Sequence, residues 1–213
     1  MRRFLIVILC LFLGTNANAF CQRIIPSATV SASTGFVRYI THLSRDEFLR
    51  NAPQKMSPNT LGMTVSRLGV TGSADPEVQR TERNLFCVQI RSVHLTIGYE
   101  TLDVYIDRKY SPGTCEYEVV KEHENYHVRV SQEAMMFYRP DIERALERAL
   151  SHIDPEYASS NDDIQRIFNK QFDRVMAELQ PLITFINNKI AEKNYIIDTP
   201  QSYAETTALC ENW

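Results

Sequence analysis

The sequence predicts an α+β fold in which a β-rich N-terminal half packs on a helical C-terminal half. From Phe20 to about Tyr110, apolar and polar residues alternate and turn residues are frequent, which is typical of strands. From Glu116 to about Asn194, apolar residues recur at helical spacing. Because strands and helices are segregated along the chain, an alternating βαβ fold is not expected.

Composition favours a single globular domain. The chain has 213 residues, of which 44% are hydrophobic and 23% are charged, and its formal net charge is −3. These values exclude disordered and fibrous classes. A protein that binds by neutralising phosphates would be more basic, so nucleic acid is not an expected partner.

Residues 1–19 have the pattern of a secretory signal peptide. Two arginines precede an apolar run from Phe4 to Leu13, and an Ala-Asn-Ala sequence supplies small residues at the cleavage position. The run is shorter than the roughly 20 residues of a membrane-spanning helix. We therefore expect an exported protein, periplasmic or extracellular, whose residues 20–213 form one domain without stable membrane insertion.

The cysteine content predicts two disulfides. The chain contains five cysteines, and Cys10 would leave with the signal peptide. An even number in an exported chain indicates disulfides, although four cysteines allow three pairings. We favour pairing Cys21 with Cys87 and Cys115 with Cys210.

The first half contains several strand-like segments. Short strands are expected over 36–40 and 63–68, and a short helix begins near Ser44, where a cap residue precedes two acids. The β-rich half ends at Ser111-Pro112-Gly113.

A hairpin is the clearest β signal. Apolar residues alternate over Phe86–Ile90 and then change phase, which predicts a bulge near Arg91. We interpret Gly98-Tyr99-Glu100 as the turn and Leu102–Ile106 as the return strand. His94, on the polar side, is expected to be solvated.

Three or four helices are expected in the second half, with prolines marking their limits. The expected helices are 116–138, 140–153, and one capped by 159–163 that Pro181 breaks or kinks before 182–193. The tail after Tyr195 is expected to be irregular and tied down by Cys210.

An HExxH motif, His123-Glu124-Asn125-Tyr126-His127, lies within the first of these helices. Histidines four residues apart share one helix face, so both imidazoles can reach one Zn²⁺. Glu124 can accept a proton from metal-activated water. Both histidines fall within the helix's apolar stripe, where a metal ion would supply a shared partner. The alternative is a pair of hydrogen-bonded core histidines beside a surface glutamate.

On this motif the chain resembles the zincin metallopeptidases, whose active helix carries HExxH below a small β-sheet. The resemblance implies a zinc-dependent peptidase with His123 and His127 as zinc ligands and Glu124 as general base. Lys121 and Arg129 depart from the usual flanking pattern, which weakens the peptidase interpretation more than the metal interpretation.

The third ligand is not fixed by the motif. One zincin pattern places a glutamate about twenty residues downstream on the next helix, which here implies Glu147. Glu143 and His152 remain alternatives because each lies nearer the apolar stripe of that predicted helix. Candidate donors to an oxyanion are Tyr157, Tyr195 and Tyr203.

The chain is also loosely similar to a group of exported bacterial zinc-dependent proteases with a cysteine-bearing loop before the metal helix and a late Thr-x-His-Gly segment. Cys115 fits the first feature, but Gln201 and Ser202 stand where His-Gly would be. We expect an exported zinc protease acting on protein or peptide substrates. The alternatives are an envelope binding or assembly protein with weak or no catalysis, and a zinc amidase acting on cell-wall material.

Overall fold

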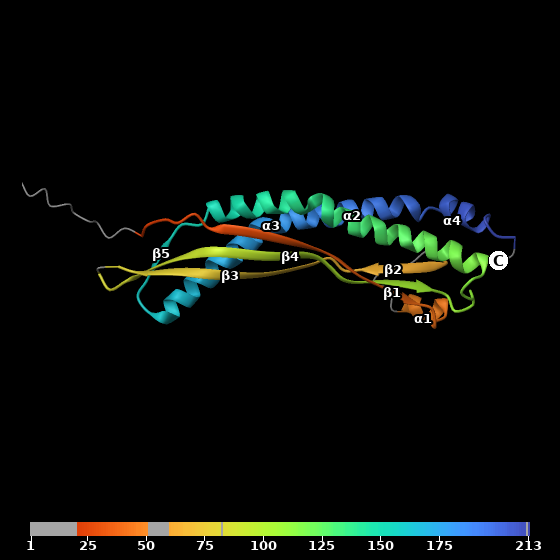
Figure 1. Cartoon of the computed structure of the whole chain (residues 1–213), viewed down its shortest axis with the longest axis horizontal. Coiled ribbons are helices and arrows are strands. Elements are labelled where there is room, and N and C mark those ends of the chain that lie inside the picture. Colours follow the sequence, from red (N-terminus) through yellow and green to blue (C-terminus); the bar gives the residue numbers. More distant parts are fainter. Residues whose placement is uncertain (1–20, 51–59, 82, 212) are drawn as a thin grey trace, which may run out of the picture.

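The computed structural model describes residues 21–50, 60–81, 83–211 and 213. Within these residues it confirms the α+β class: four strands from the first half of the chain and the short β5 from the second half form one five-stranded sheet, and the long helices come from the second half (Figure 1). The predicted signal peptide lies outside the described residues. The elements are β1 Ser27–Ile40, α1 Arg45–Arg50, β2 Gly62–Ser66, β3 Gly69–Arg80, β4 Phe86–Ile106, α2 Cys115–Ser151, β5 Glu156–Ala158, α3 Asn161–Ile197 and α4 Pro200–Thr207.

The long strand β4 forms the centre of the sheet and pairs with all the other strands. On one edge it pairs parallel with β1, and on the other edge antiparallel with β3 and then β2. The three-residue β5 pairs with the beginning of β4. The predicted strands at 36–40 and 63–68 fall in β1 and β2, whereas β3 and β5 were not predicted.

The predicted hairpin is wrong, because β4 continues through Gly98 instead of turning. Gly98 has a φ of 139°, and a Cβ at this position would lie only 1.9 Å from the Ser33 carbonyl oxygen. The glycine therefore permits close approach of β1 and does not mark a turn. The bulge is confirmed, since Asp75 pairs with Ser92 while Pro76 pairs with Ile90, leaving Arg91 between them. His94 is exposed, as expected.

Both long helices run through a proline. The two helices predicted on either side of Pro140 form one 37-residue helix, α2. Pro181 likewise lies inside the 37-residue α3. A proline removes one helical hydrogen bond, but Met135 and Leu146 are fully buried on either side of Pro140, and tertiary packing of an apolar face outweighs the local loss.

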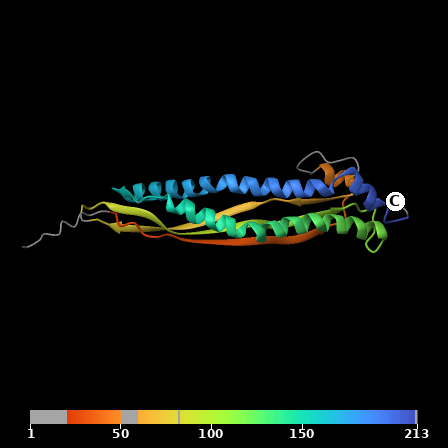
Figure 2. The same cartoon turned by 90° about the horizontal axis from the view of Figure 1, so that it is seen from above.

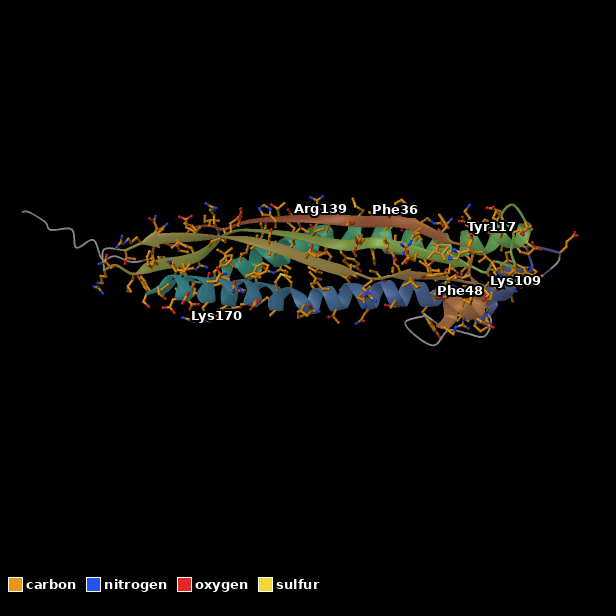
Figure 3. All side chains as sticks on the ribbon, turned by 90° about the horizontal axis from the view of Figure 1, so that it is seen from below. Phe36, Phe48, Lys109, Tyr117, Arg139 and Lys170 are labelled. Carbon is orange, nitrogen blue, oxygen red and sulfur yellow. A yellow bond between two sulfur atoms is a disulfide. The ribbon has the colours of Figure 1, made fainter. Side chains whose placement is uncertain are left out.

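Helices α2 and α3 lie side by side over one face of the sheet (Figure 2). The core lies between these helices and β4, and it includes Val93, Leu95, Leu102, Met135, Ile142, Leu146, Val175 and Ile186. The resulting molecule is elongated, so its two ends are far apart. Figure 3 shows Phe48, Lys109 and Tyr117 near one end and Lys170 toward the other.

The structure contains both favoured disulfides, Cys21–Cys87 and Cys115–Cys210. They lie at opposite ends of the molecule (Figure 1). Two disulfides fit a protein exported to an oxidising compartment. Among the described residues, no helix is both long enough and apolar enough to cross a membrane.

The tail is more regular than predicted. Helix α3 extends to Ile197, and Thr199 caps the short helix α4 by accepting a hydrogen bond from the Ser202 backbone. Cys210 then ties the tail to the start of α2. The segment 198–210 is thereby placed against the helix that carries the HExxH motif.

Candidate metal centre

The two motif histidines converge on a carboxylate that the sequence interpretation did not include. Asp198 Oδ1 lies 3.3 Å from His123 Nε2 and 3.1 Å from His127 Nε2. The three ligand atoms lie within 4.8 Å of one another. In a tetrahedral zinc site with bonds of about 2.0–2.1 Å, ligand atoms are about 3.3–3.4 Å apart. The oxygen-to-nitrogen spacings therefore fit ligands that share one ion.

Helix packing explains how Asp198 reaches this position. The short connection around β5 returns the chain, so the C-terminal end of α3 lies beside the N-terminal part of α2 (Figure 2). Asp198 is the C-cap of α3. Since α2 and α3 have the same length, the end of one helix meets the beginning of the other.

Two further side chains orient the three ligands. Asn194 Oδ1 lies 3.1 Å from His127 Nδ1 and can accept a hydrogen bond from its N–H, which directs Nε2 of the ring toward Asp198. The Tyr203 hydroxyl donates to Asp198 Oδ1 at 3.0 Å. The Tyr203 ring also stacks on His123, with centroids 5.2 Å apart and an interplanar angle of 30°.

The cluster is mostly buried but reaches the surface through its carboxylate. The side chains of both histidines are 9% exposed, whereas that of Asp198 is 35% exposed. Burial opposes ionisation of Asp198, but hydrogen bonds from His123 and His127 hold its pKa well below the usual range. Burial and the nearby Asp198 carboxylate raise the pKa of Tyr203. The site thus presents an ionised carboxylate beside a protonated phenol.

Glu124 lies one position from His123 and faces the sheet. It is only 2% exposed, and Thr64 of β2 donates a hydrogen bond to its Oε2 at 2.8 Å. Burial raises the pKa of Glu124, although His127 and His123 act in the opposite direction. This is a second carboxyl group with an environment different from that of Asp198.

Glycine at position 62 leaves room for the Glu124 carboxyl group. A Cβ there would lie 2.8 Å from Glu124 Oε1 and 2.8 Å from Val120 Cγ1. We therefore expect Gly62→Ala to displace Glu124 while leaving the two histidines in place. If Glu124 is the general base that the HExxH motif predicts, hydrolytic activity should fall at least about tenfold while metal content stays unchanged, because a misplaced general base loses much of its effect.

Gly113→Ala provides a comparison for that variant, since a Cβ at Gly113 would meet no atom within 4 Å, although its φ of 88° strains the substitution. Activity and the thermal midpoint of unfolding would be measured together for both variants. If Gly62→Ala kept full activity, the position of the Glu124 carboxyl group would not depend on a glycine at position 62.

Glu147, the predicted third ligand, does not lie at the cluster of His123, His127 and Asp198. It lies on α2 itself, 20 positions after His127, which places it about 30 Å along the same helix. Glu143 also lies on α2 and is excluded for the same reason. His152 caps that helix and contacts Glu178, 3.1 Å from Nδ1 to Oε2. The spacing pattern assumes a ligand on a separate helix, whereas α2 continues through Pro140 without a break.

Of the three candidate tyrosines, Tyr203 lies at the cluster. Tyr195 is 76% exposed, and the Tyr157 hydroxyl accepts a hydrogen bond from the Cys21 backbone near the opposite end. The sequence signal that would have located Asp198 is the Asp-Thr-Pro sequence, which marks the end of one helix and the start of the next.

No protein-family model, no curated protein and no solved structure matches this chain.

Proposed function

We propose that this protein is a zinc-dependent peptidase. The observation that carries the proposal is the meeting of His123, His127 and Asp198 donor atoms within 4.8 Å. The buried Glu124, next to His123 in α2, interacts electrostatically with all three residues. Two imidazoles and one carboxylate form a donor set that suits zinc, and three protein ligands leave a coordination position free. Catalytic zinc sites differ from closed structural sites in this respect.

Zinc, when bound, would polarise a substrate carbonyl and lower the pKa of water. Glu124 then acts as the general base that accepts the proton from the attacking water. Thr64 holds Oε2 of this carboxylate, so its orientation is fixed before substrate binds. The same carboxyl group can return the proton to the leaving amine, because its neighbours exclude bulk water.

The sheet offers a place for an extended peptide. Among the described strands, β2 pairs only with β4, so its other edge is unpaired. Thr64, which contacts Glu124, lies in the middle of β2. A peptide added along this edge would hydrogen-bond through its backbone and pass near the general base. This arrangement favours an extended peptide substrate.

A second candidate function is metal-dependent binding without catalysis. The observation that favours it is the enclosure of Glu124, which is 2% exposed and hydrogen-bonded to Thr64, as a purely structural carboxyl group would be. The metal ligands would then serve to hold α2, α3 and the chain end together. This candidate predicts zinc binding and no hydrolysis.

The proposal is tested by measuring zinc and hydrolysis in the same preparation. We expect about one zinc per chain by mass spectrometry, and cleavage of an unbiased peptide library that a chelator abolishes and added zinc restores. His123→Ala should lose both, whereas His94→Ala, on an exposed strand position, should keep both. Zinc binding without peptide cleavage would favour the binding role, and cleavage of peptidoglycan fragments alone would indicate an amidase.

A further inference from the structure

The short helix α4 lies against the metal cluster and contributes to its geometry. Asp198 precedes α4 by one residue, Thr199. From within α4, Tyr203 stacks on His123 and donates its hydroxyl hydrogen to Asp198. Any displacement of α4 would therefore remove a hydrogen bond from the carboxylate and a ring from the imidazole.

Most residues of α4 are exposed or half-buried. Tyr203 is its one buried residue. The helix has a cavity on each side: one of about 440 Å³ lined by Thr60, Tyr110, Pro200 and Ala204, and one of about 450 Å³ lined by Val119, His123, Ser202 and Thr206. Eight residues are too few for a stable isolated helix in water.

A covalent bond closes the other end of this segment. Cys210, three residues after α4, is joined to Cys115, the first residue of α2. The segment from Asp198 to Cys210 is thus fixed at one end by α3 and at the other end by the helix that carries both histidines. Cys115 is exposed whereas Cys210 is buried, so a reductant in solution would approach the bond from the Cys115 side.

We infer that the Cys115–Cys210 disulfide controls the affinity of the metal centre, which is fully assembled only in the oxidised chain. This inference rests on the proposed zinc site. A dithiol reductant would donate two electrons and two protons, breaking the sulfur–sulfur bond into two thiols while itself becoming a disulfide. Helix α4 would then detach, and Asp198 would lose the Tyr203 hydroxyl that orients it. Zinc uptake would accordingly follow disulfide formation in an oxidising compartment.

The second disulfide provides a matched control. Cys21–Cys87 lies at the opposite end of the molecule, away from the metal cluster (Figure 1). We expect the double variant Cys115→Ser/Cys210→Ser to bind zinc at least about tenfold more weakly than the wild type, the loss typical when an orienting partner is removed. Cys21→Ser/Cys87→Ser should keep the wild-type affinity. Each dissociation constant would be measured by competition with a chromophoric chelator.

Three further measurements distinguish the proposed effect of the Cys115–Cys210 disulfide on zinc affinity from a general effect on folding. Amide hydrogen exchange should accelerate in residues 198–208 of the Cys115→Ser/Cys210→Ser variant and stay unchanged in β4. Adding a phosphine reductant to folded Cys21→Ser/Cys87→Ser protein should weaken zinc binding without any new substitution. Tyr203→Phe keeps the ring but removes the hydroxyl, so it should weaken zinc binding while the disulfide remains closed.

Equal zinc affinity and equal exchange in both double-cysteine variants would overturn the inference and leave the zinc site intact. Absence of zinc from the oxidised wild type would overturn the zinc site and this inference together. The two failures are therefore distinguishable from one set of samples.

Discussion

Replacing Asp198 with alanine is expected to remove zinc from the protein almost completely. The substitution deletes the only carboxylate among the three donors and leaves two histidines with no third ligand. Loss of an orienting partner alone weakens metal sites about 10- to 100-fold, so we expect loss of this ligand to weaken binding by more than about 100-fold. Competition titration with a chelator measures the effect directly.

Glu147→Ala is the control for that variant. It removes one negative charge, as Asp198→Ala does, but from an exposed position far along α2. Its zinc affinity should equal that of the wild type. If zinc binding were lost in Glu147→Ala and kept in Asp198→Ala, Asp198 would not be a zinc ligand. Glu147, the ligand expected from the sequence, would then be supported instead.

Glu124→Gln is expected to abolish most hydrolysis while preserving the zinc content. The amide has the shape of the carboxyl group and can still accept the hydrogen bond from Thr64, but it cannot take a proton from water. General base catalysis contributes about 10²- to 10⁴-fold, so kcat/KM should fall by about that factor. Zinc per chain and kcat/KM would be measured on the same sample.

Glu133→Gln serves as the comparison, because Glu133 is an exposed glutamate on the same helix. It should retain both zinc and activity. If Glu124→Gln kept the wild-type rate, Glu124 would be a structural carboxyl group. If the wild type itself showed no hydrolysis, the variant would instead be compared in a partner-binding assay.

The features predicted well from the sequence are those that local spacing determines. Alternating apolar residues place a bulge near Arg91, and the histidine spacing places His123 and His127 on one helix face. The segregation of strands from helices is also visible along the chain. Each of these patterns depends on residues that lie close together in the sequence.

The incorrect predictions share one physical cause. Gly98 and Pro140 were interpreted as ends of elements because their local preferences disfavour continuation. In the structure, β4 passes through Gly98 because β1 approaches closely there, and α2 passes through Pro140 because both sides of it pack on the sheet. Long-range packing outweighs a local cost of a few kcal/mol.

The sequence by itself determined the chemistry available to this protein: two imidazoles one helical turn apart, a carboxyl group beside them, and cysteines for two disulfides. Only the tertiary structure decided which carboxylate meets the two imidazoles. Asp198 is separated from His127 by 71 residues, and the separation closes because α3 returns along α2. Packing of two long helices, which local spacing does not encode, brings the carboxylate to the histidines.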